Sequence, residues 1–580
     1  MDKKQVWQSW LQDERLDALL LRELEALTRE AKHEELLERF SKDLEFGTGG
    51  MRAKLGVGIN RMNVHTVRRA TYGVVKWLME KSLDKRKLAI GYDGRHQSRE
   101  FAEATAQVAV AFGVEVILYR QPRPTPFLSF AVRHLQCGAG VMVTASHNPP
   151  EYNGYKVYGA DGGQILSEDA DAIVKVMQDK TDVFAVPFVS TEDPLFRKLV
   201  TETDEAIEEA YYREITSLYS LANDEEKSSL KVVYTPLHGT GAEVVPEALH
   251  RAGFAEVLTV PEQMRLDPDF RFTRSPNPEE ESAYDLAVKV ALDAKADVIF
   301  ATDPDTDRVG VMARDHRGEY VLLTGNEVGA LALDFYLEIL QKKGNLPENG
   351  RVVTTIVTSD FGEEVAKPFG VVTERVLTGF KYIGDRIHVY EEEGNAQFVF
   401  GYEESVGYLA LPFVRDKDAV QATVLLASMA ANRKQRYGDL VAARDALFEK
   451  YGYFRDQLLG FTFAGQSGLL QMQRFMSELH ATPIEIDELP LVTVEDYLTL
   501  TRRDVTSGEQ TTLTLPEADV VKYFYQGGSW LAVRPSGTEP KLKVYLGAKG
   551  ADWQDAERAL KALHQAFSSR IAPYLKGDAQ

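Results

Sequence analysis

Three stretches of the chain repeat one order of elements, in which short runs of apolar, β-branched residues alternate with longer amphipathic segments. This alternation predicts α/β layers, with helices covering a mainly parallel sheet. Each stretch closes on an apolar run followed at once by a polar loop, namely the loop containing Ser146, residues 303–308 and residues 402–405. Because open α/β sheets bind ligands at the carboxyl ends of their strands, the three loops are predicted to face one cleft.

The chain after about residue 451 has a different pattern. Strand-like runs over 529–535 and 541–548 precede an amphipathic segment over 552–570, which predicts a smaller α+β unit. A linker is expected near residues 450–460. The length of 580 residues fits about four domains. The predicted fold is therefore α/β, with four domains around a central cleft: three α/β domains at 1-205, 206-322 and 323-450, and a C-terminal α+β domain at 451-580.

Composition limits the partners and the compartment. There are 88 Asp and Glu against 67 Lys and Arg, a net charge of −21. This surplus disfavours nucleic acid and membrane as partners, so an anionic ligand must be held by a local group of cations. The N-terminus lacks the apolar run of a signal peptide, and no apolar segment is long enough to span a bilayer. With Cys137 as its single cysteine, interpreted as an inert buried thiol, the chain is predicted to be cytoplasmic.

The loop TASHNPPEYNGYK presents Ser146 and His147 where an apolar strand is predicted to end. It lacks the glycines of the GxSxG elbow of serine hydrolases. A serine at such an exit can act as a nucleophile toward phosphorus, since phosphoryl transfer depends mainly on positioning and charge neutralisation. Taken alone, the stretch is better explained by a capped turn before Pro149 and Pro150.

The loop DPDTDR places Asp303, Asp305 and Asp307 at alternate positions after an apolar strand. In an extended loop, alternate side chains point the same way, so the three carboxylates are predicted to converge. Converging carboxylates repel one another unless a cation lies among them, and oxygen ligands suit Mg²⁺. An EF-hand is excluded, because Arg308 and Arg314 stand where that motif requires Gly and Glu. A solvated acidic turn is the alternative.

Further segments carry groups that can bind a sugar or a phosphate. Glu403 and Ser405 of GYEES can accept from and donate to neighbouring sugar hydroxyls. RPSGTEPK combines cations, hydroxyls and a glycine turn into a possible phosphate cradle: Arg534, Ser536, Gly537, Thr538 and Lys541. Arg52 of FGTGGMR and Lys381 of TGFKY are further cations in glycine-containing turns. Each segment alone is explained by an ordinary turn, but together they indicate phosphoryl transfer on a sugar phosphate.

These motifs, in this order and spacing, resemble the α-D-phosphohexomutases over nearly the whole chain, and most closely the bacterial α-phosphoglucomutase branch, which is also similar to phosphoglucomutase-2 and phosphopentomutase. The resemblance implies a heart-like arrangement of four domains and an isomerase that acts as an intramolecular phosphotransferase. It implies Mg²⁺ as cofactor and glucose 1,6-bisphosphate as activator and intermediate. A small sugar phosphate is the implied partner, and we expect a monomer or weak homo-oligomer.

The resemblance also implies a role for each matching residue. Ser146 would carry the phosphoryl group and complete a metal site with Asp303, Asp305 and Asp307. Lys156 would be the general acid or base with His147 beside it, and a lowered pKa from nearby cations such as His147 or Arg52 is expected for it. Arg52 and Arg308 would steady the reacting group. The remaining implied substrate contacts are Lys381, Glu403, Ser405, Lys417, Arg534, Ser536, Gly537 and Thr538.

The expected reaction interconverts α-D-glucose 1-phosphate and glucose 6-phosphate. Two related activities, phosphopentomutase and phosphomannomutase, are alternatives with the same chemistry, and Tyr402 before the sugar-loop carboxylate keeps pentose phosphates open. A Mg²⁺-dependent sugar phosphatase and a non-catalytic sugar-phosphate sensor are the alternatives outside this class.

Overall fold

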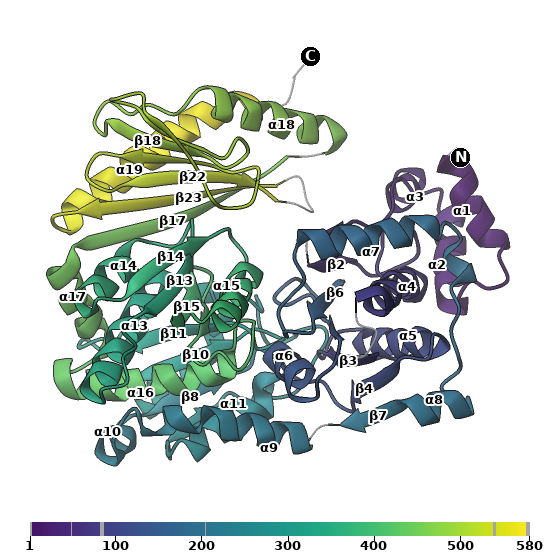
Figure 1. Ribbon diagram of the computed structural model, residues 1–580, viewed down its shortest axis with the longest axis horizontal. Coiled ribbons are helices and arrows are strands. Elements are labelled where there is room, and N and C mark those ends of the chain that lie inside the picture. The colour runs from purple at the N-terminus through teal and green to yellow at the C-terminus, as the bar shows by residue number, and fades with distance from the viewer. Residues whose placement is uncertain are drawn as a thin grey trace.

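The computed structural model of the protein places its strands in four sheets that follow one another along the chain (Figure 1). It describes residues 3–47, 49–81, 86–203, 205–463, 465–536 and 541–575. In Figure 1 the first unit (purple to blue) lies on the right, and the second, third and fourth units lie from bottom to top on the left. The sheets span residues 46–203, 232–323, 350–409 and 453–550. Three of them lie inside the predicted segments, and the second ends one residue beyond its predicted segment of 206-322. The boundaries between these segments stay predictions.

The first unit has a seven-stranded mixed sheet of order β1-β2-β6-β5-β3-β4-β7. Its central strands are apolar on both faces because helices cover both. Leu88 and Ile90 belong to the same cluster as α4 and α5 side chains, while Ala89 packs with Leu128 of α6. The strands are β1 (Phe46–Gly47), β2 (Gly50–Lys54), β3 (Lys87–Tyr92), β4 (Glu115–Tyr119), β5 (Ala139–Val143), β6 (Tyr152–Gly159) and β7 (Val200–Thr203). The helices are α1 (Lys3–Gln12), α2 (Ala18–Arg29), α3 (His33–Arg39), α4 (Val64–Lys81), α5 (Ser98–Ala111), α6 (Thr125–His134), α7 (Ser167–Asp179) and α8 (Pro194–Leu199).

The second and third units have five-stranded and four-stranded mixed sheets, of orders β12-β11-β10-β8-β9 and β14-β13-β15-β16. The second contains α9 (Glu205–Glu214), α10 (Asp224–Ser229), β8 (Val232–Thr235), α11 (Gly241–Arg251), β9 (Val257–Thr259), α12 (Asp285–Ala294), β10 (Val298–Thr302), β11 (Val309–Arg314) and β12 (Tyr320–Leu323). The third contains α13 (Gly325–Lys342), β13 (Gly350–Thr355), α14 (Phe361–Ala366), β14 (Val372–Val376), α15 (Phe380–Glu393), β15 (Gln397–Glu403), β16 (Gly407–Leu409), α16 (Ala419–Tyr437) and α17 (Leu440–Tyr451). Short 3-10 turns are η1 (Val183–Ala185), η2 (Ile215–Ser220), η3 (Pro261–Gln263), η4 (Glu281–Tyr284) and η5 (Lys367–Phe369).

The first three units share one local arrangement at their polar loops. In each, a strand with a parallel neighbour (β5, β10 or β15) turns directly into an antiparallel partner (β6, β11 or β16). Each connecting loop holds one non-glycine residue in the left-handed region: Ser146 (φ +51°), Thr306 (φ +56°) and Val406 (φ +54°). Such backbone costs free energy for a side chain with a Cβ, and at functional sites it can serve to orient a reacting group. The three loops therefore mark equivalent places in three similar units.

The fourth unit is an antiparallel sheet of order β17-β23-β22-β21-β18-β19-β20. Helices α18 and α19 cover it, and Phe475 and Phe567 of these helices pack with Val533 and Val544 of the sheet. The elements are β17 (Tyr453–Thr462), α18 (Gly465–Ala481), β18 (Leu491–Asp496), β19 (Thr501–Asp504), β20 (Gln510–Thr512), β21 (Val521–Tyr525), β22 (Trp530–Pro535), β23 (Lys541–Gly550) and α19 (Trp553–Leu575). Of residues 450–460, where a linker is expected, those from Tyr453 onward form β17, which pairs with β23 along its whole length, so Gly452 alone connects α17 to β17.

Packing joins the first three units more closely to one another than to the fourth. One apolar cluster runs through the first three and reaches the fourth at Phe454. The fourth has a cluster of its own and a smaller one shared with the third, around Ile356, Trp530 and Tyr545. Within the described chain, no helix is both long and apolar enough to cross a membrane.

Candidate active site

Ser146 lies in a tight turn just after β5, and its side chain reaches into the second unit. Its Oγ donates to Oδ2 of Asp303 at 2.7 Å and lies 3.2 Å from Nδ1 of His147. The backbone N–H of Ser146 donates to Oγ1 of Thr144 at 2.9 Å, which secures the left-handed turn from inside the loop. The hydroxyl of Ser146 is thus aimed at the acidic loop.

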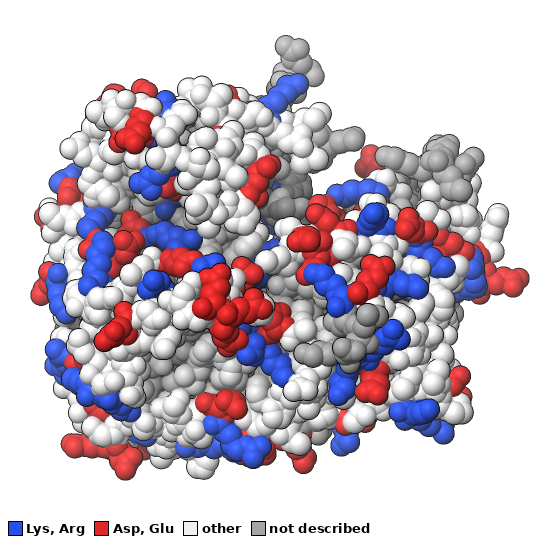
Figure 2. Space-filling model, in the orientation of Figure 1, with Lys and Arg blue, Asp and Glu red and all other residues white. Residues whose placement is uncertain are grey.

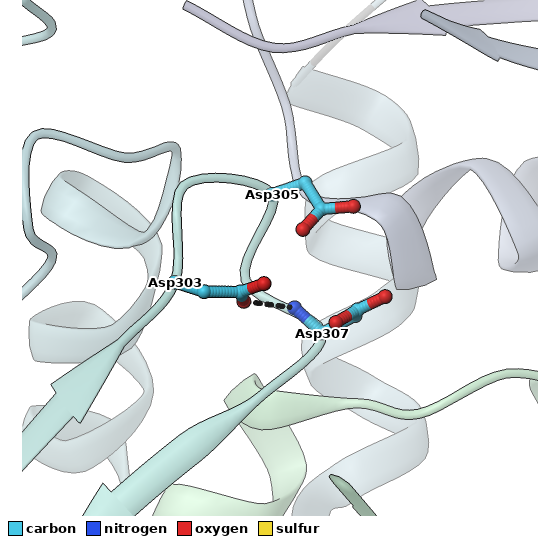
Figure 3. Close-up of side chains that lie close together, drawn as sticks. All are labelled: Asp303, Asp305 and Asp307. Carbon is cyan, nitrogen blue, oxygen red and sulfur yellow. Dashed lines mark hydrogen bonds between the residues drawn. The ribbon is translucent and has the colours of Figure 1, made fainter. Parts of the chain in front are cut away.

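The carboxylates of Asp303, Asp305 and Asp307 converge as predicted (Figure 3). All three are buried, and one oxygen from each lies within 4.8 Å of the others. The convergence does not arise from the extended loop that was expected. The chain turns at Thr306, whose N–H donates to the Asp303 carbonyl at 3.0 Å, and Oδ1 of Asp303 accepts from the N–H of Asp307 at 3.1 Å.

This cluster has the chemistry of a divalent-cation site. Oδ1 of Asp305 and Oδ1 of Asp307 are buried without a hydrogen-bond partner. Burial, and then repulsion by the other two carboxylates, holds the pKa of Asp303 well above its usual range. Buried, unpartnered carboxylate oxygens at this spacing fit a hard cation such as Mg²⁺. We therefore identify the three aspartates as the residues that could hold a metal.

Two lysines meet on the same carboxylates. Lys156 of β6 donates from Nζ to Oδ2 of Asp305 at 2.8 Å and to Oδ2 of Asp307 at 3.2 Å, and Nζ of Lys417 lies 3.2 Å from the same Asp307 oxygen. Burial disfavours the charged form of Lys156, but the two carboxylates outweigh it and raise its pKa. The lowered pKa expected for Lys156 is therefore wrong for this arrangement of charges.

The remaining predicted cations of the first two units border the same space. Nη1 of Arg52 donates to Oδ1 of Asn148 at 2.9 Å, and Nη1 of Arg308 donates to Oε1 of Glu279 at 2.6 Å. Burial, followed by the charges of Arg308 and Arg52, lowers the pKa of His147 well below its usual range. His147 is consequently a neutral ring beside Ser146 near neutral pH.

The third unit brings Glu403 and Lys381 to the cleft. Glu403 ends β15 and accepts from the backbone N–H of Gly379 at 2.9 Å, and burial raises the pKa of its carboxyl. Lys381 lies in the first turn of α15, where burial lowers its pKa to about 8. Ser405 follows in the loop before β16 and lines the same cleft.

The fourth unit contributes a pair of cations. Arg534, near the end of β22, lies opposite Lys543 of β23, and the N–H of Ser536 donates to the carbonyl of Lys541 at 2.7 Å. Burial, and then the charge of Arg534, lowers the pKa of Lys543. The predicted phosphate contacts Gly537 and Thr538 lie outside the described residues.

A cleft of about 510 Å³ joins these groups. Its lining includes Arg52, Ser146, His147, Lys156, Asp307, Arg308, Lys381, Glu403, Ser405, Lys417, Arg534 and Lys543. Figure 2 shows acidic and basic side chains interspersed over one face of the molecule, so the outer surface there carries charge of both signs. Seven of the residues that line the cleft are Lys or Arg and five are Asp or Glu, so cations outnumber carboxylates there, which suits an anionic ligand despite the net charge of −21 of the whole chain.

Several lining residues were not predicted from the sequence. Glu279 and Asp416 pair with the cations Arg308 and Lys417. Lys543 could have been found, because it faces Arg534 across the predicted hairpin. Glu279 and Asp416 follow no strand motif, so the sequence offered no comparable signal for them.

Comparisons with known proteins give the family of the chain. Four family models match in order: phosphoglucomutase/phosphomannomutase alpha/beta/alpha domain I (residues 43–183), domain II (209–318), domain III (324–448) and the C-terminal domain (487–560). The chain belongs to the phosphoglucomutase/phosphomannomutase family. The resemblance to α-D-phosphohexomutases and the predicted class of fold, three α/β domains and a C-terminal domain, are confirmed.

Individual members of the phosphoglucomutase/phosphomannomutase family are similar over most of their length. A phosphoglucomutase of Staphylococcus haemolyticus is 39% identical over 508 residues, which cover 87% of this chain and 90% of that protein. A phosphoglucomutase of Staphylococcus aureus is 34% identical over 528 residues, covering 91% and 93%. Among solved structures, the open form of parafusin, a phosphoglucomutase from Paramecium, superposes with a TM-score of 0.65 at 17% identity, covering 92% of this chain and 94% of that one.

The substitution Gly154→Ala tests how closely β6 packs against the loop that carries Ser146. A Cβ there would lie 2.4 Å from the Thr144 carbonyl oxygen and 2.9 Å from that of Met51. We expect Gly154→Ala to lower stability by about 1–3 kcal/mol through overpacking, and to lower kcat because Thr144 orients Ser146. Gly460→Ala, which adds a Cβ in open space on another strand, is the matched control. Thermal melts and steady-state kinetics measure both effects, and a G154A enzyme as active and stable as G460A would contradict this account.

Proposed function

We propose that the protein is a phosphoglucomutase that interconverts α-D-glucose 1-phosphate and glucose 6-phosphate through a phosphorylated Ser146. The observation that carries the proposal is the 2.7 Å contact between Ser146 Oγ and Asp303 of the buried carboxylate cluster. It puts a nucleophile beside a cation site at one wall of a cleft whose other wall holds Arg534 and Lys543. The names of the relatives described above support glucose as the sugar.

The metal site supplies charge neutralisation. Asp303, Asp305, Asp307 and an oxygen on Ser146 would hold Mg²⁺, and the bound ion would neutralise charge on the group being transferred. Arg52 and Arg308 line the same part of the cleft and are assigned to steady the phosphoryl group.

When the phosphoryl group passes from Ser146 to the sugar, a sugar oxygen replaces Ser146 Oγ on the phosphorus. The 6-oxygen of glucose 1-phosphate forms a bond to phosphorus as the bond from phosphorus to Ser146 Oγ breaks, which yields glucose 1,6-bisphosphate. We assign the proton movement to Lys156, whose charged ammonium group gives a proton to Ser146 Oγ and regains one from the sugar hydroxyl, with the neutral His147 beside the serine. The bisphosphate then turns over and returns its 1-phosphate to Ser146, leaving glucose 6-phosphate.

The reorientation needs a second anion site that accepts either phosphate. We assign it to Arg534, Ser536, Gly537 and Thr538, the last two on the sequence motif alone, together with Lys543. Glu403 and Ser405 are assigned to the sugar hydroxyls, with Lys381 and Lys417 as further contacts. Movement of the fourth unit is expected to close the cleft and keep water from the phosphoserine.

Turnover of three sugar phosphates distinguishes the related mutases. With Mg²⁺ and a trace of the matching bisphosphate, we expect kcat/KM to be highest for glucose 1-phosphate, compared with mannose 1-phosphate and ribose 1-phosphate. Preference for ribose 1-phosphate would replace the proposal with a phosphopentomutase, and preference for mannose 1-phosphate with a phosphomannomutase. Release of inorganic phosphate in step with substrate loss would instead indicate a phosphatase, and binding without any conversion would indicate a sensor. A cytoplasmic location and a monomeric or weakly associating state stay predictions.

A further inference from the structure

Arg95 is completely buried beneath the loop that carries Ser146. It follows β3 in the segment GYDGRHQS, at the carboxyl end of a strand adjacent to β5. Its side chain is 0% exposed, as is that of Asp93, whose Oδ2 lies 3.3 Å from Nε of Arg95. The charge of the guanidinium is therefore compensated in place, and it makes no contact with solvent.

The guanidinium of Arg95 gathers four backbone carbonyls of the serine loop. Nη2 donates to the carbonyl oxygens of Ser146 and Asn148, each at 2.5 Å. Nη1 donates to those of Pro149 at 2.9 Å and Tyr152 at 3.1 Å. One planar group thus bonds the loop at both ends and in the middle, a geometry that the single nitrogen of lysine does not reproduce.

These contacts act on the two groups that would handle the phosphoryl group. The Ser146 carbonyl is attached to the residue with φ +51°, so holding this oxygen opposes relaxation of the strained turn. Holding the Asn148 carbonyl fixes the residue whose Oδ1 accepts from Arg52. Both the Oγ of Ser146 and the guanidinium of Arg52 consequently depend on the position of Arg95.

Hydrogen bonds hold the Asp93 carboxylate beside Arg95, and Arg95 also contacts the second unit. Oδ1 of Asp93 accepts from the N–H of Arg95 at 3.0 Å and from Oγ of Ser98 at 2.7 Å. On the other side, the ring centroid of Phe270, a second-unit residue, lies 5.0 Å from Cζ of Arg95. Arg95 therefore lies between the serine loop and the unit that supplies the metal-binding aspartates.

We propose that Arg95 is a positioning residue for the transfer reaction, which holds Ser146 in line with the acidic cluster by binding the loop carbonyls. This inference rests on the proposed role of Ser146 as phosphoryl carrier. Because misplacement of a reacting group by about 1 Å costs on the order of 100-fold in rate, Arg95→Lys should lower kcat by about that factor with little change in KM.

The test compares R95K with Arg99→Lys, a substitution on α5 at an exposed arginine that bonds Glu103. Each enzyme is phosphorylated with glucose 1,6-bisphosphate, and transfer to glucose 1-phosphate is followed by quenched flow alongside kcat, KM and the melting temperature. We expect slow transfer in R95K, a normal rate in R99K, and partial recovery of kcat in Arg95→Ala on addition of guanidinium ion. A folded R95K that transfers at the wild-type rate would overturn the proposal, even if its melting temperature falls.

Asp93→Asn gives a second measurement should R95K fail to fold. It keeps the oxygen that accepts from Arg95 N–H and Ser98 while removing the charge that holds the guanidinium, and we expect a smaller loss of transfer rate, about tenfold. A folded D93N with the wild-type rate would overturn the proposal. If the wild-type enzyme takes up no phosphoryl group, the proposed function fails instead, and intact mass distinguishes that outcome by the absence of a gain of about 80 Da.

Discussion

Ser146→Ala is expected to abolish conversion of glucose 1-phosphate to glucose 6-phosphate, with a loss of about 10⁴-fold or more in kcat. The reason is that the Ser146 hydroxyl both donates to Asp303 at 2.7 Å and lines the cleft, whereas the Thr125 hydroxyl, which donates to Asp305 at 2.8 Å, is not among the described lining residues. Removal of a covalent nucleophile typically costs about this much or more. The measurement is coupled-assay turnover in Mg²⁺ with a trace of glucose 1,6-bisphosphate.

The control for this variant is Ser477→Ala, which removes an exposed serine hydroxyl on α18. Both variants should melt near the wild-type temperature, since each change deletes one oxygen. Incubation with the bisphosphate should add about 80 Da to wild type and S477A and nothing to S146A. Near-normal turnover by S146A would rule out the covalent mechanism.

Loss of the metal site is expected to have the second largest effect. Chelation with EDTA, or Asp305→Asn, should lower kcat by about 10³-fold, since the ion provides several kcal/mol of charge stabilisation and each 1.36 kcal/mol corresponds to about a tenfold change in rate. Oδ1 of Asp305 is buried without a partner, so an amide there removes charge from the cluster at nearly constant shape. Steady-state kinetics with and without added Mg²⁺ measure the loss.

The melting temperature gives an independent measurement of cation binding at the three aspartates. Mg²⁺ should raise the melting temperature of the wild-type protein, because a cation that binds only the folded state stabilises it. The shift should be absent in D305N and present in Asp293→Asn, a change at an exposed position in the same unit. An unchanged melting temperature in the wild type, together with EDTA-resistant turnover, would show that the cluster holds no functional cation.

The acidic loop shows which structural features the sequence pattern predicted and which it did not. Spacing predicted that Asp303, Asp305 and Asp307 converge, and they do. The expected cause was an extended loop, whereas the observed cause is a turn at Thr306 with a left-handed backbone. Residue types and spacing indicated the chemistry correctly, but the backbone conformation also involves contacts outside the motif: the N–H of Thr125 donates to the Asp305 carbonyl at 2.9 Å, and that of Ala419 to the Thr306 carbonyl at 3.2 Å.

The pKa of Lys156 shows more clearly what local sequence cannot predict. From the sequence, Lys156 was expected to have cations as neighbours and a lowered pKa. In the structure, its Nζ lies against Asp305 and Asp307, which stand about 150 residues later in the chain and raise that pKa. Electrostatic effects depend on distance in space, so a pKa cannot be assigned from local sequence.

The sequence by itself determined the order of strands and helices, the loops that carry chemistry and the types of group in them, because hydrophobic periodicity and turn residues act locally. Only the tertiary structure decided which groups meet: Ser146 with Asp303, Lys156 and Lys417 on Asp307, and Arg95 beneath the serine loop. The contacts to Asp303 and Asp307 join separate units and form only when the apolar cluster shared by the first three units brings their strand ends together, whereas Arg95 reaches the serine loop from a neighbouring strand of the same unit.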